Sequence, residues 1–197
     1  MCFVFAYALL QERAAAMLRH HSDHDALTNC LNRRTFNAAL DRLDASTRTD
    51  ACCAILLIDI DHFKSVNDQH GHLVGDRIIT EVAAVLGRIL DARTPLFRYG
   101  GEEFAAVLYG ADAAVGGALA ERLRAEVEAA DFRTMKITVS IGVSEWKAAD
   151  GRVAIAVGEA DNALYDAKRG GRNRVVVRPP AEEAGPVVTP SSLIASA

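Results

Sequence analysis

Residues 98–104 read Arg-Tyr-Gly-Gly-Glu-Glu-Phe, and this run holds the residue types best suited to chemistry. Gly100 and Gly101 carry no Cβ, so they permit a sharp turn and a close approach of the backbone to a ligand. Apolar residues on both sides predict a β-hairpin over about 96–108 with the glycines at its tip. Glu102 and Glu103 follow directly, and carboxylate oxygens are the ligands that Mg²⁺ prefers. The run therefore predicts a hairpin tip that carries a divalent metal site.

A second acidic position follows a buried strand. Residues 52–58 form a continuous apolar run rich in β-branched residues, which predicts a central strand. The sequence Asp59-Ile-Asp-His-Phe-Lys then leaves this strand and enters a short helix. A longer helix is predicted over about 72–90, because its apolar residues share one face.

The other elements complete a mixed α and β pattern. Helices are predicted over 32–44, 111–129 and 153–169, the last ended by Gly170-Gly171, and strands over 136–143 and 173–177. The strand at 136–143 alternates apolar and polar residues, which predicts one buried face.

The order of these elements predicts an α+β fold. With one extra helix set aside, it is β-α-β-β-α-β, a ferredoxin-like (palm-type) sandwich whose central antiparallel sheet is flanked by helices. Such a sheet makes the strand 52–58 a neighbour of the hairpin, and we expect Asp59 to face Glu102 and Glu103.

The composition is that of a soluble protein with one folded domain. The chain has 197 residues, half of them hydrophobic, and a net charge of −4, which gives no reason to expect nucleic-acid binding through phosphates. We predict three parts: an N-terminal stalk helix over 1–22, a domain over 23–178 and a disordered tail over 179–197 that holds four of the five prolines. The cysteines of the whole chain include no C-x-x-C pair, which favours reduced thiols and a cytoplasmic location.

The first residues leave two interpretations open. Residues 1–10 are apolar but too few to cross a bilayer, which takes about 20. They are either part of the stalk or the cytosolic end of a longer membrane helix, with a membrane or sensor domain upstream of residue 1. A heptad-like stripe over 5–21 indicates either a two-stranded stalk or a helix packed on the domain.

Five ordered blocks over residues 23–177 resemble the GGDEF family of diguanylate cyclases, in its Gly-Gly-Glu-Glu-Phe form. Beside the hairpin run they are Asp25-Ala-Leu-Thr with Asn32-Arg-Arg; Asp59-Ile-Asp-His-Phe-Lys-Ser-Val-Asn-Asp with Gly71-His and Gly75-Asp; Thr138-Val-Ser-Ile-Gly; and Ala160-Asp-Asn-Ala-Leu-Tyr-Asp-Ala-Lys with Gly171-Arg-Asn-Arg-Val. One departure is Asn29-Cys30, where the family usually has Gly-Leu. Asn tolerates a left-handed backbone better than most residues, so we expect the turn to survive.

The resemblance implies that two GTP molecules are joined into cyclic di-GMP with release of two pyrophosphates. It implies two Mg²⁺ ions per active site, with Mn²⁺ as an alternative, held by Asp59, the Ile60 carbonyl, Glu102 and Glu103. Glu102 is the catalytic candidate, either as general base or as the ligand of the metal that activates the hydroxyl.

The resemblance also implies the substrate contacts. Lys64, Lys168 and Arg172 would contact the triphosphate, with Gly100 and Gly101 close to the substrate. Asn67 and Asp76 would bind guanine, with His72 nearby. Guanine offers N1–H and N2–H₂ donors, which suit the Asp76 carboxylate and disfavour ATP.

One site holds one GTP, so the product requires a homodimer. Many family members carry an inhibitory Arg-x-x-Asp product site five residues before the glycines. Here that stretch is Asp91-Ala-Arg-Thr, and Arg88-Ile-Leu-Asp91 lies three residues too early, so we expect no product inhibition at this site. Two alternatives stay open: a catalytically silent GTP-binding or scaffold module, and an interaction domain that works through the stalk.

Overall fold

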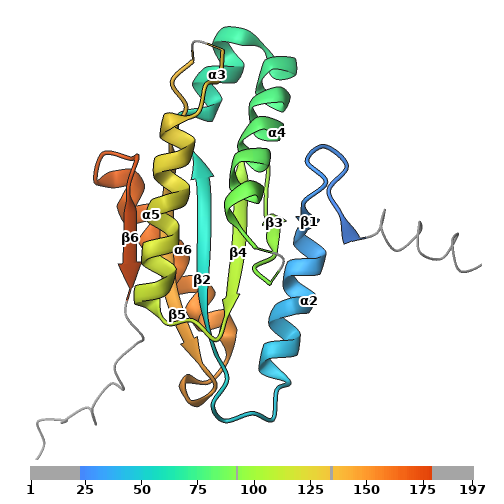
Figure 1. Cartoon of the computed structure of the whole chain (residues 1–197), viewed down its shortest axis with the longest axis vertical. Coiled ribbons are helices and arrows are strands. Elements are labelled where there is room, and N and C mark those ends of the chain that lie inside the picture. Colours follow the sequence, from blue (N-terminus) through green and yellow to red (C-terminus); the bar gives the residue numbers. More distant parts are fainter. Residues whose placement is uncertain (1–22, 92, 134, 179–197) are drawn as a thin grey trace, which may run out of the picture.

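The computed structural model describes residues 23–91, 93–133 and 135–178. The predicted stalk helix at 1–22 and the predicted tail at 179–197 lie outside these residues. The described part forms a six-stranded sheet in the order β1-β3-β4-β2-β5-β6, with helices on both faces (Figure 1).

The centre of the sheet is antiparallel. β2 (Cys52–Ile60) lies between β4 (Glu103–Tyr109) and β5 (Val139–Lys147), and it runs antiparallel to both. β3 (Leu96–Arg98) pairs antiparallel with β4 and completes the predicted hairpin. These four strands and their connecting helices confirm the predicted α+β, ferredoxin-like core.

Both edges add a parallel strand to this core. β6 (Val175–Arg178) lies beside β5, and the two-residue β1 (Leu31–Asn32) lies beside β3. The predicted antiparallel sheet is therefore the middle of a mixed sheet. The predicted last strand begins two residues later than expected, because residues 173 and 174 belong to the turn after the last helix.

The helices divide between the two faces of the sheet. α3 (Phe63–His70), α4 (His72–Ile89) and α5 (Ala113–Ala129) cover one face, and α2 (Arg33–Asp44) and α6 (Val153–Arg169) cover the other. A short 3₁₀ helix, Ala148–Asp150, connects β5 to α6. Figure 1 shows α3 at the end of the molecule to which β2 points.

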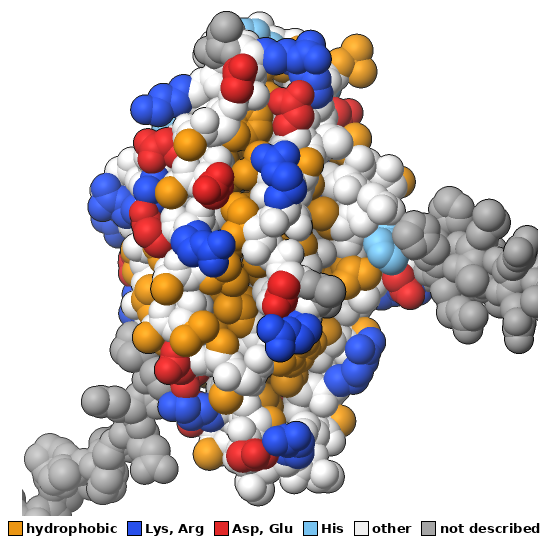
Figure 2. Space-filling view, viewed as in Figure 1, with side chains coloured by type: hydrophobic (Ala, Val, Ile, Leu, Met, Phe, Trp, Pro, Cys, Tyr) orange, Lys and Arg blue, Asp and Glu red, His pale blue; other side chains and the backbone are white. Residues whose placement is uncertain are grey.

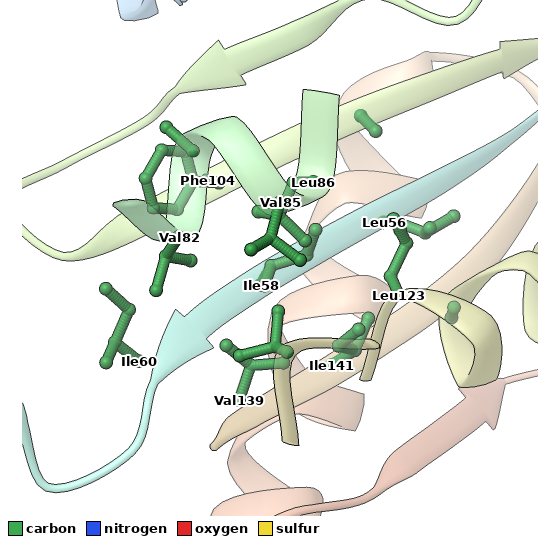
Figure 3. Close-up of a cluster of buried hydrophobic side chains, with 14 of the residues drawn as sticks. Leu56, Ile58, Ile60, Val82, Val85, Leu86, Phe104, Leu123, Val139 and Ile141 are labelled. Atoms are coloured by element: carbon green, nitrogen blue, oxygen red, sulfur yellow. The ribbon is translucent and has the colours of Figure 1, made fainter. Parts of the chain in front are cut away.

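The larger core lies between the sheet and helices α4 and α5. Ile58 of β2, Leu86 of α4 and Leu123 of α5 are almost fully buried there, and Figure 3 shows them together with Phe104 and Ile141 of the neighbouring strands. Burial of large apolar side chains is the main favourable term in folding, at about 1.5–3 kcal/mol each. This core fixes the ends of β2 and β4 relative to each other.

The prediction of one buried face for the strand at 136–143 was wrong. β5 begins at Val139, and its residues are buried up to Trp146, including Ser140 and Ser144. The Ser140 hydroxyl bonds to the buried Asp61 carboxylate, and the Ser144 hydroxyl donates a 2.6 Å hydrogen bond to the Ala156 carbonyl of α6. A sheet covered on both faces buries both sets of side chains.

The surface carries both signs of charge. Figure 2 shows Lys and Arg side chains interspersed with Asp and Glu over the face formed by α4 and α5. Among the described residues, no helix combines the length and the apolar character that crossing a membrane requires.

Candidate functional site

The end of β2 lies beside the hairpin tip, as the sequence predicts. Asp59 is the register partner of Glu103 across β2 and β4. One residue further on, the Ile60 N–H donates a 3.3 Å hydrogen bond to the Glu102 carbonyl. Both glutamates are half-buried. The sheet register therefore brings three carboxylate-bearing residues to one edge.

Asp59 is a buried carboxylate with a cation beside it. The Nζ atom of Lys168, in the last turn of α6, lies 2.8 Å from Asp59 Oδ2. Burial raises the pKa of Asp59 to about 6, although the hydrogen bond and charge of Lys168 lower it, and the nearby charges of Glu102 and Glu103 raise it further. The site thus concentrates negative charge where water is largely excluded.

The hairpin tip folds back on Glu103. The Tyr99 and Gly100 N–H groups donate to the Glu103 carbonyl at 2.8 and 3.2 Å. A Cβ placed on Gly100 would lie 2.4 Å from Glu103 Oε2, whereas one on Gly101 would meet nothing within 4 Å. A side chain at position 100 would therefore displace the flexible Glu103 carboxylate, which lies against the Gly100 backbone.

Arg98 holds the tip to the start of the domain, a role that the sequence reasoning missed. Its Nη2 donates to the Gly101 carbonyl at 2.8 Å, and its Nη1 donates to Asp25 Oδ1 at 2.8 Å. Asp25 in turn accepts hydrogen bonds from the Thr28 N–H and hydroxyl at 2.9 and 2.8 Å. Asn29 follows with φ of 58°, the left-handed conformation expected when Asn replaces Gly.

A second group of predicted residues lies between α3 and α4. The Asn67 side chain lies against Gly75, where an added Cβ would be 1.9 Å from its Oδ1. The same Oδ1 atom is buried without a hydrogen-bond partner. A buried, unpaired acceptor is costly, so the Asn67 amide would gain a hydrogen bond by turning toward a donor from a ligand. Asp76 is exposed one residue beyond Gly75.

The remaining predicted contacts are arranged around these two groups. Lys64 on α3 and His72 at the start of α4 are both exposed. Arg172 is half-buried in the turn after α6, where its N–H donates to the Ala167 carbonyl at 3.0 Å and Gly171 has φ of 114°. This is the hydrogen-bond pattern of a glycine-ended helix, as predicted from Gly170-Gly171. The substrate roles of these residues stay predictions.

Asp61 has a different environment from Asp59. Its carboxylate is buried and accepts hydrogen bonds from Thr138, Ser140 and the Asn173 N–H. The sequence reasoning gave this acid no role. The signal available was its two-residue spacing from Asp59, which would have suggested a second metal ligand and not this set of donors.

The oxygen ligands at this site suit a hard divalent cation, although their side chains are not drawn together around one point. Asp59, Glu102 and Glu103 supply carboxylate oxygens, and the Ile60 carbonyl lies at the same strand end. In the described part of the chain, no three His, Cys, Asp or Glu side chains converge closely enough to hold a metal ion. The cation beside Asp59 is the Lys168 ammonium group.

Comparison with known proteins identifies the same domain throughout. The family model described as "Diguanylate cyclase, GGDEF domain" matches residues 22–174. The chain is 38% identical over 186 residues to the probable diguanylate cyclase DgcT of Escherichia coli K12. The alignment covers 90% of this chain and 39% of that protein. This chain spans less than half the length of the first curated relatives that it matches.

Solved structures share the fold. The coiled coil and GGDEF domain of DgcB from Caulobacter crescentus, in complex with c-di-GMP, align with a TM-score of 0.80 at 35% identity, covering 89% of this chain and 95% of that one. The active GGEEF domain of a diguanylate cyclase from Vibrio cholerae aligns with a TM-score of 0.68 at 31% identity, covering 78% and 98% of the two chains.

Proposed function

Because the chain belongs to the GGDEF family of diguanylate cyclases, we propose that it condenses two GTP molecules into cyclic di-GMP and releases two pyrophosphates. The observation that carries the proposal is the register of Asp59 with Glu103, beside Glu102. It places three carboxylate-bearing residues at one end of the sheet, an arrangement that suits metal-assisted phosphoryl chemistry. Each half-reaction is the attack of a ribose 3′-hydroxyl on the α-phosphate of the other GTP.

Asp59, the Ile60 carbonyl, Glu102 and Glu103 would hold two Mg²⁺ ions, with Mn²⁺ as the alternative. When bound, these ions neutralise triphosphate charge and lower the pKa of the attacking hydroxyl. Lys168 would leave Asp59 for the triphosphate as the metal binds. Glu102 would orient the hydroxyl or accept its proton.

The triphosphate would lie over the turn between β2 and α3. The N-terminus of α3 has no side-chain cap, so its first N–H groups can donate to phosphate oxygens. Lys64 and Arg172 would add positive charge on either side of this turn. The backbone at Gly100 and Gly101 permits the close approach of the phosphates to the hairpin tip.

Guanine would bind between α3 and α4. The buried, unpaired Asn67 Oδ1 suits a guanine donor, and the Asp76 carboxylate suits N1–H and N2–H₂. His72 lies at the same helix start. Adenine lacks this pair of donors, so the proposed guanine site should select GTP over ATP by at least the value of one charge-assisted hydrogen bond, about 1.5–3 kcal/mol.

Each domain would bind one GTP, so catalysis requires two copies face to face. We propose a homodimer as the active form, with residues 1–22 as its stalk and with cytoplasmic location. The Asp91 carboxylate is engaged by Arg93 and Thr94 within its own loop, at 3.1 and 3.0 Å. This supports the expectation of no product inhibition through an Arg-x-x-Asp site.

The test is a product assay with purified protein, Mg²⁺ and either GTP or ATP. Mass spectrometry should identify cyclic di-GMP and pyrophosphate with GTP and no cyclic product with ATP. GTP binding without any turnover by a dimeric preparation would instead support the silent scaffold module. Added cyclic di-GMP should leave the initial rate unchanged, and a fall at micromolar concentrations would refute the missing product site.

A further inference from the structure

Asp61 is a buried acid that the proposed chemistry does not use. It follows the last residue of β2, and only 4% of its surface is exposed. Its Oδ2 accepts from the Thr138 hydroxyl at 2.7 Å and from the Asn173 N–H at 3.0 Å. Its Oδ1 accepts from the Ser140 hydroxyl at 2.7 Å. Both oxygens are thus bonded to β5 or the residue directly before it, and Oδ2 is also bonded to the turn after α6.

That turn has a backbone conformation that its surroundings must maintain. Arg172 and Asn173 have φ of 62° and 46°, in the left-handed region that residues other than glycine avoid. The Asn173 side chain donates to Glu128 Oε1 at 2.8 Å and accepts from Arg124 Nη1 at 2.8 Å. The turn is therefore held on one side by α5 and on the other by Asp61.

Asp61 also fixes the turn in which it lies, between β2 and α3. Its N–H donates to the Thr138 carbonyl at 2.9 Å, directly after Ile60. His62 follows with φ of 56°, and α3 begins at Phe63. The direction in which the chain leaves β2 thus depends on the bonds of Asp61 to Thr138 and Ser140, at the start of β5.

We propose that Asp61 is a positioning residue that joins the two halves of the triphosphate site. One half is the turn with the Ile60 carbonyl and the N-terminus of α3, and the other is the turn with Arg172. The inference rests on the proposed function, since it concerns how that site is held in place. Asp61 acts through its neighbours and does not touch the substrate.

The isosteric variant Asp61→Asn tests this directly. An amide is neutral and has one acceptor oxygen, so the bonds from Thr138 and Asn173 lose their charge assistance. Its NH₂ group would face the Ser140 hydroxyl, which would have to turn and accept. Thr138→Val removes a single donor at nearly constant volume, and Thr138→Ser is its matched control because it keeps the hydroxyl. Positioning partners of this kind typically contribute 10- to 100-fold to activity or affinity.

The experiment uses the full chain and three readouts: melting temperature, affinity for 3′-deoxy-GTP with Mg²⁺, and kcat and KM for GTP. The deoxy nucleotide cannot react because it lacks the attacking hydroxyl. We expect Asp61→Asn and Thr138→Val to fold and to lose about 10- to 100-fold in both affinity and kcat/KM, with Thr138→Ser within about threefold of the unmodified chain. A folded Asp61→Asn with unchanged affinity and kcat/KM would overturn the proposal, as would equal losses in Thr138→Val and Thr138→Ser.

Amide hydrogen exchange separates this inference from the proposed function. The Asn173 N–H should exchange faster in Asp61→Asn than in the unmodified chain, whether or not the protein turns over GTP. An unmodified chain that binds but does not convert GTP overturns the proposed function alone, because exchange and 3′-deoxy-GTP affinity still decide the role of Asp61. If Asp61→Asn fails to fold, the comparison of Thr138→Val with Thr138→Ser in affinity and kcat/KM tests the role of Asp61.

Discussion

The Lys168 ammonium group lies 2.8 Å from the Asp59 carboxylate, joining the last turn of α6 to the end of β2. The side chains are 32% and 10% exposed, so the pair is shielded from solvent more than a surface ion pair is. A buried carboxylate needs such a partner, because desolvation penalises its charge. In the proposed function Asp59 would hold a metal ion, and the Lys168 ammonium group would pair with the triphosphate.

Removing the ammonium group should therefore destabilise the metal-free protein. For Lys168→Met at about pH 8 we expect a loss of about 1–3 kcal/mol in the free energy of unfolding in EDTA, because Asp59 is left buried without its partner. Added Mg²⁺ should stabilise this variant more than the unmodified chain. The exposed neighbour Arg169 gives the control Arg169→Met, and thermal denaturation with and without Mg²⁺ is the measurement. Equal stability of Lys168→Met and the unmodified chain in EDTA would argue against the pair.

The bond between Arg98 and Asp25 should appear in the pH dependence of stability. Burial raises the pKa of Asp25, but the hydrogen bonds from Arg98 and Thr28 outweigh burial, so the net pKa lies below the ordinary value of 3.8. A lowered carboxyl pKa stabilises the fold above the unfolded pKa, and the contribution is lost as pH falls below about 4. Asp25→Asn should thus be less stable than the unmodified chain at neutral pH, by about 1–3 kcal/mol.

Urea denaturation across the acidic range measures this difference. It should shrink as pH falls through about 4 and toward the lowered pKa. Asp23→Asn is the control, because the Asp23–Arg34 pair is exposed and should contribute little at any pH. A constant difference between Asp25→Asn and the unmodified chain would contradict the assignment.

Two adjacent glycines provide a test of Glu103. In Gly100→Ala the new Cβ would lie 2.4 Å from Glu103 Oε2, so the flexible carboxylate must move. We expect little change in stability but a loss of about 10-fold or more in Mn²⁺ affinity, since a proposed ligand is displaced. Gly101→Ala meets no atom within 4 Å and should keep its Mn²⁺ affinity. Titration with Mn²⁺ followed by electron paramagnetic resonance decides it, and equal affinities in both variants would count against Glu103 as a ligand.

Two glycines of α4 test the proposed guanine site in the same way. In Gly75→Ala the Cβ would lie 1.9 Å from Asn67 Oδ1, so this side chain must leave its position. Loss of one hydrogen bond to the base should weaken GTP binding by about 10-fold. Gly87→Ala meets nothing within 4 Å, and it should leave GTP affinity unchanged while stabilising the helix by about 0.5–1 kcal/mol. Calorimetric titration with GTP measures both affinities. Unchanged affinity in Gly75→Ala would show that Asn67 does not bind guanine.

The sequence was most informative about elements with a strong apolar pattern. The continuous run at 52–58 predicted β2, and the glycine tip predicted the hairpin, so the approach of Asp59 to Glu103 followed from topology alone. The polar alternation at 136–143 was misleading, because both faces of β5 are covered. The apolar residues of the alternation pack in the core with α4 and α5, whereas Ser140 is buried against Asp61 and Ser144 against α6. A single strand does not reveal whether a distant helix covers its second face.

Contacts between distant residues were the least predictable. Arg98 belongs to the most informative run in the chain, yet its bond to Asp25 depends on β1 lying parallel to β3. The three donors to Asp61 come from Thr138 just before β5, from Ser140 within it and from a left-handed turn, and neither periodicity nor spacing places them. A spacing of two residues from Asp59 suggests shared ligation, whereas the turn after β2 directs the two acids to different partners.

The most direct test of the central claim is cyclic di-GMP formation by Glu102→Ala, measured by mass spectrometry beside the unmodified chain at equal Mg²⁺ and GTP concentrations. Glu102 is half-buried at the tip beside Asp59, so its loss should leave the fold and the melting temperature nearly intact. We predict cyclic di-GMP from the unmodified chain and none from pure Glu102→Ala. Undiminished product from folded Glu102→Ala, or none from the unmodified dimer, would contradict the proposed site.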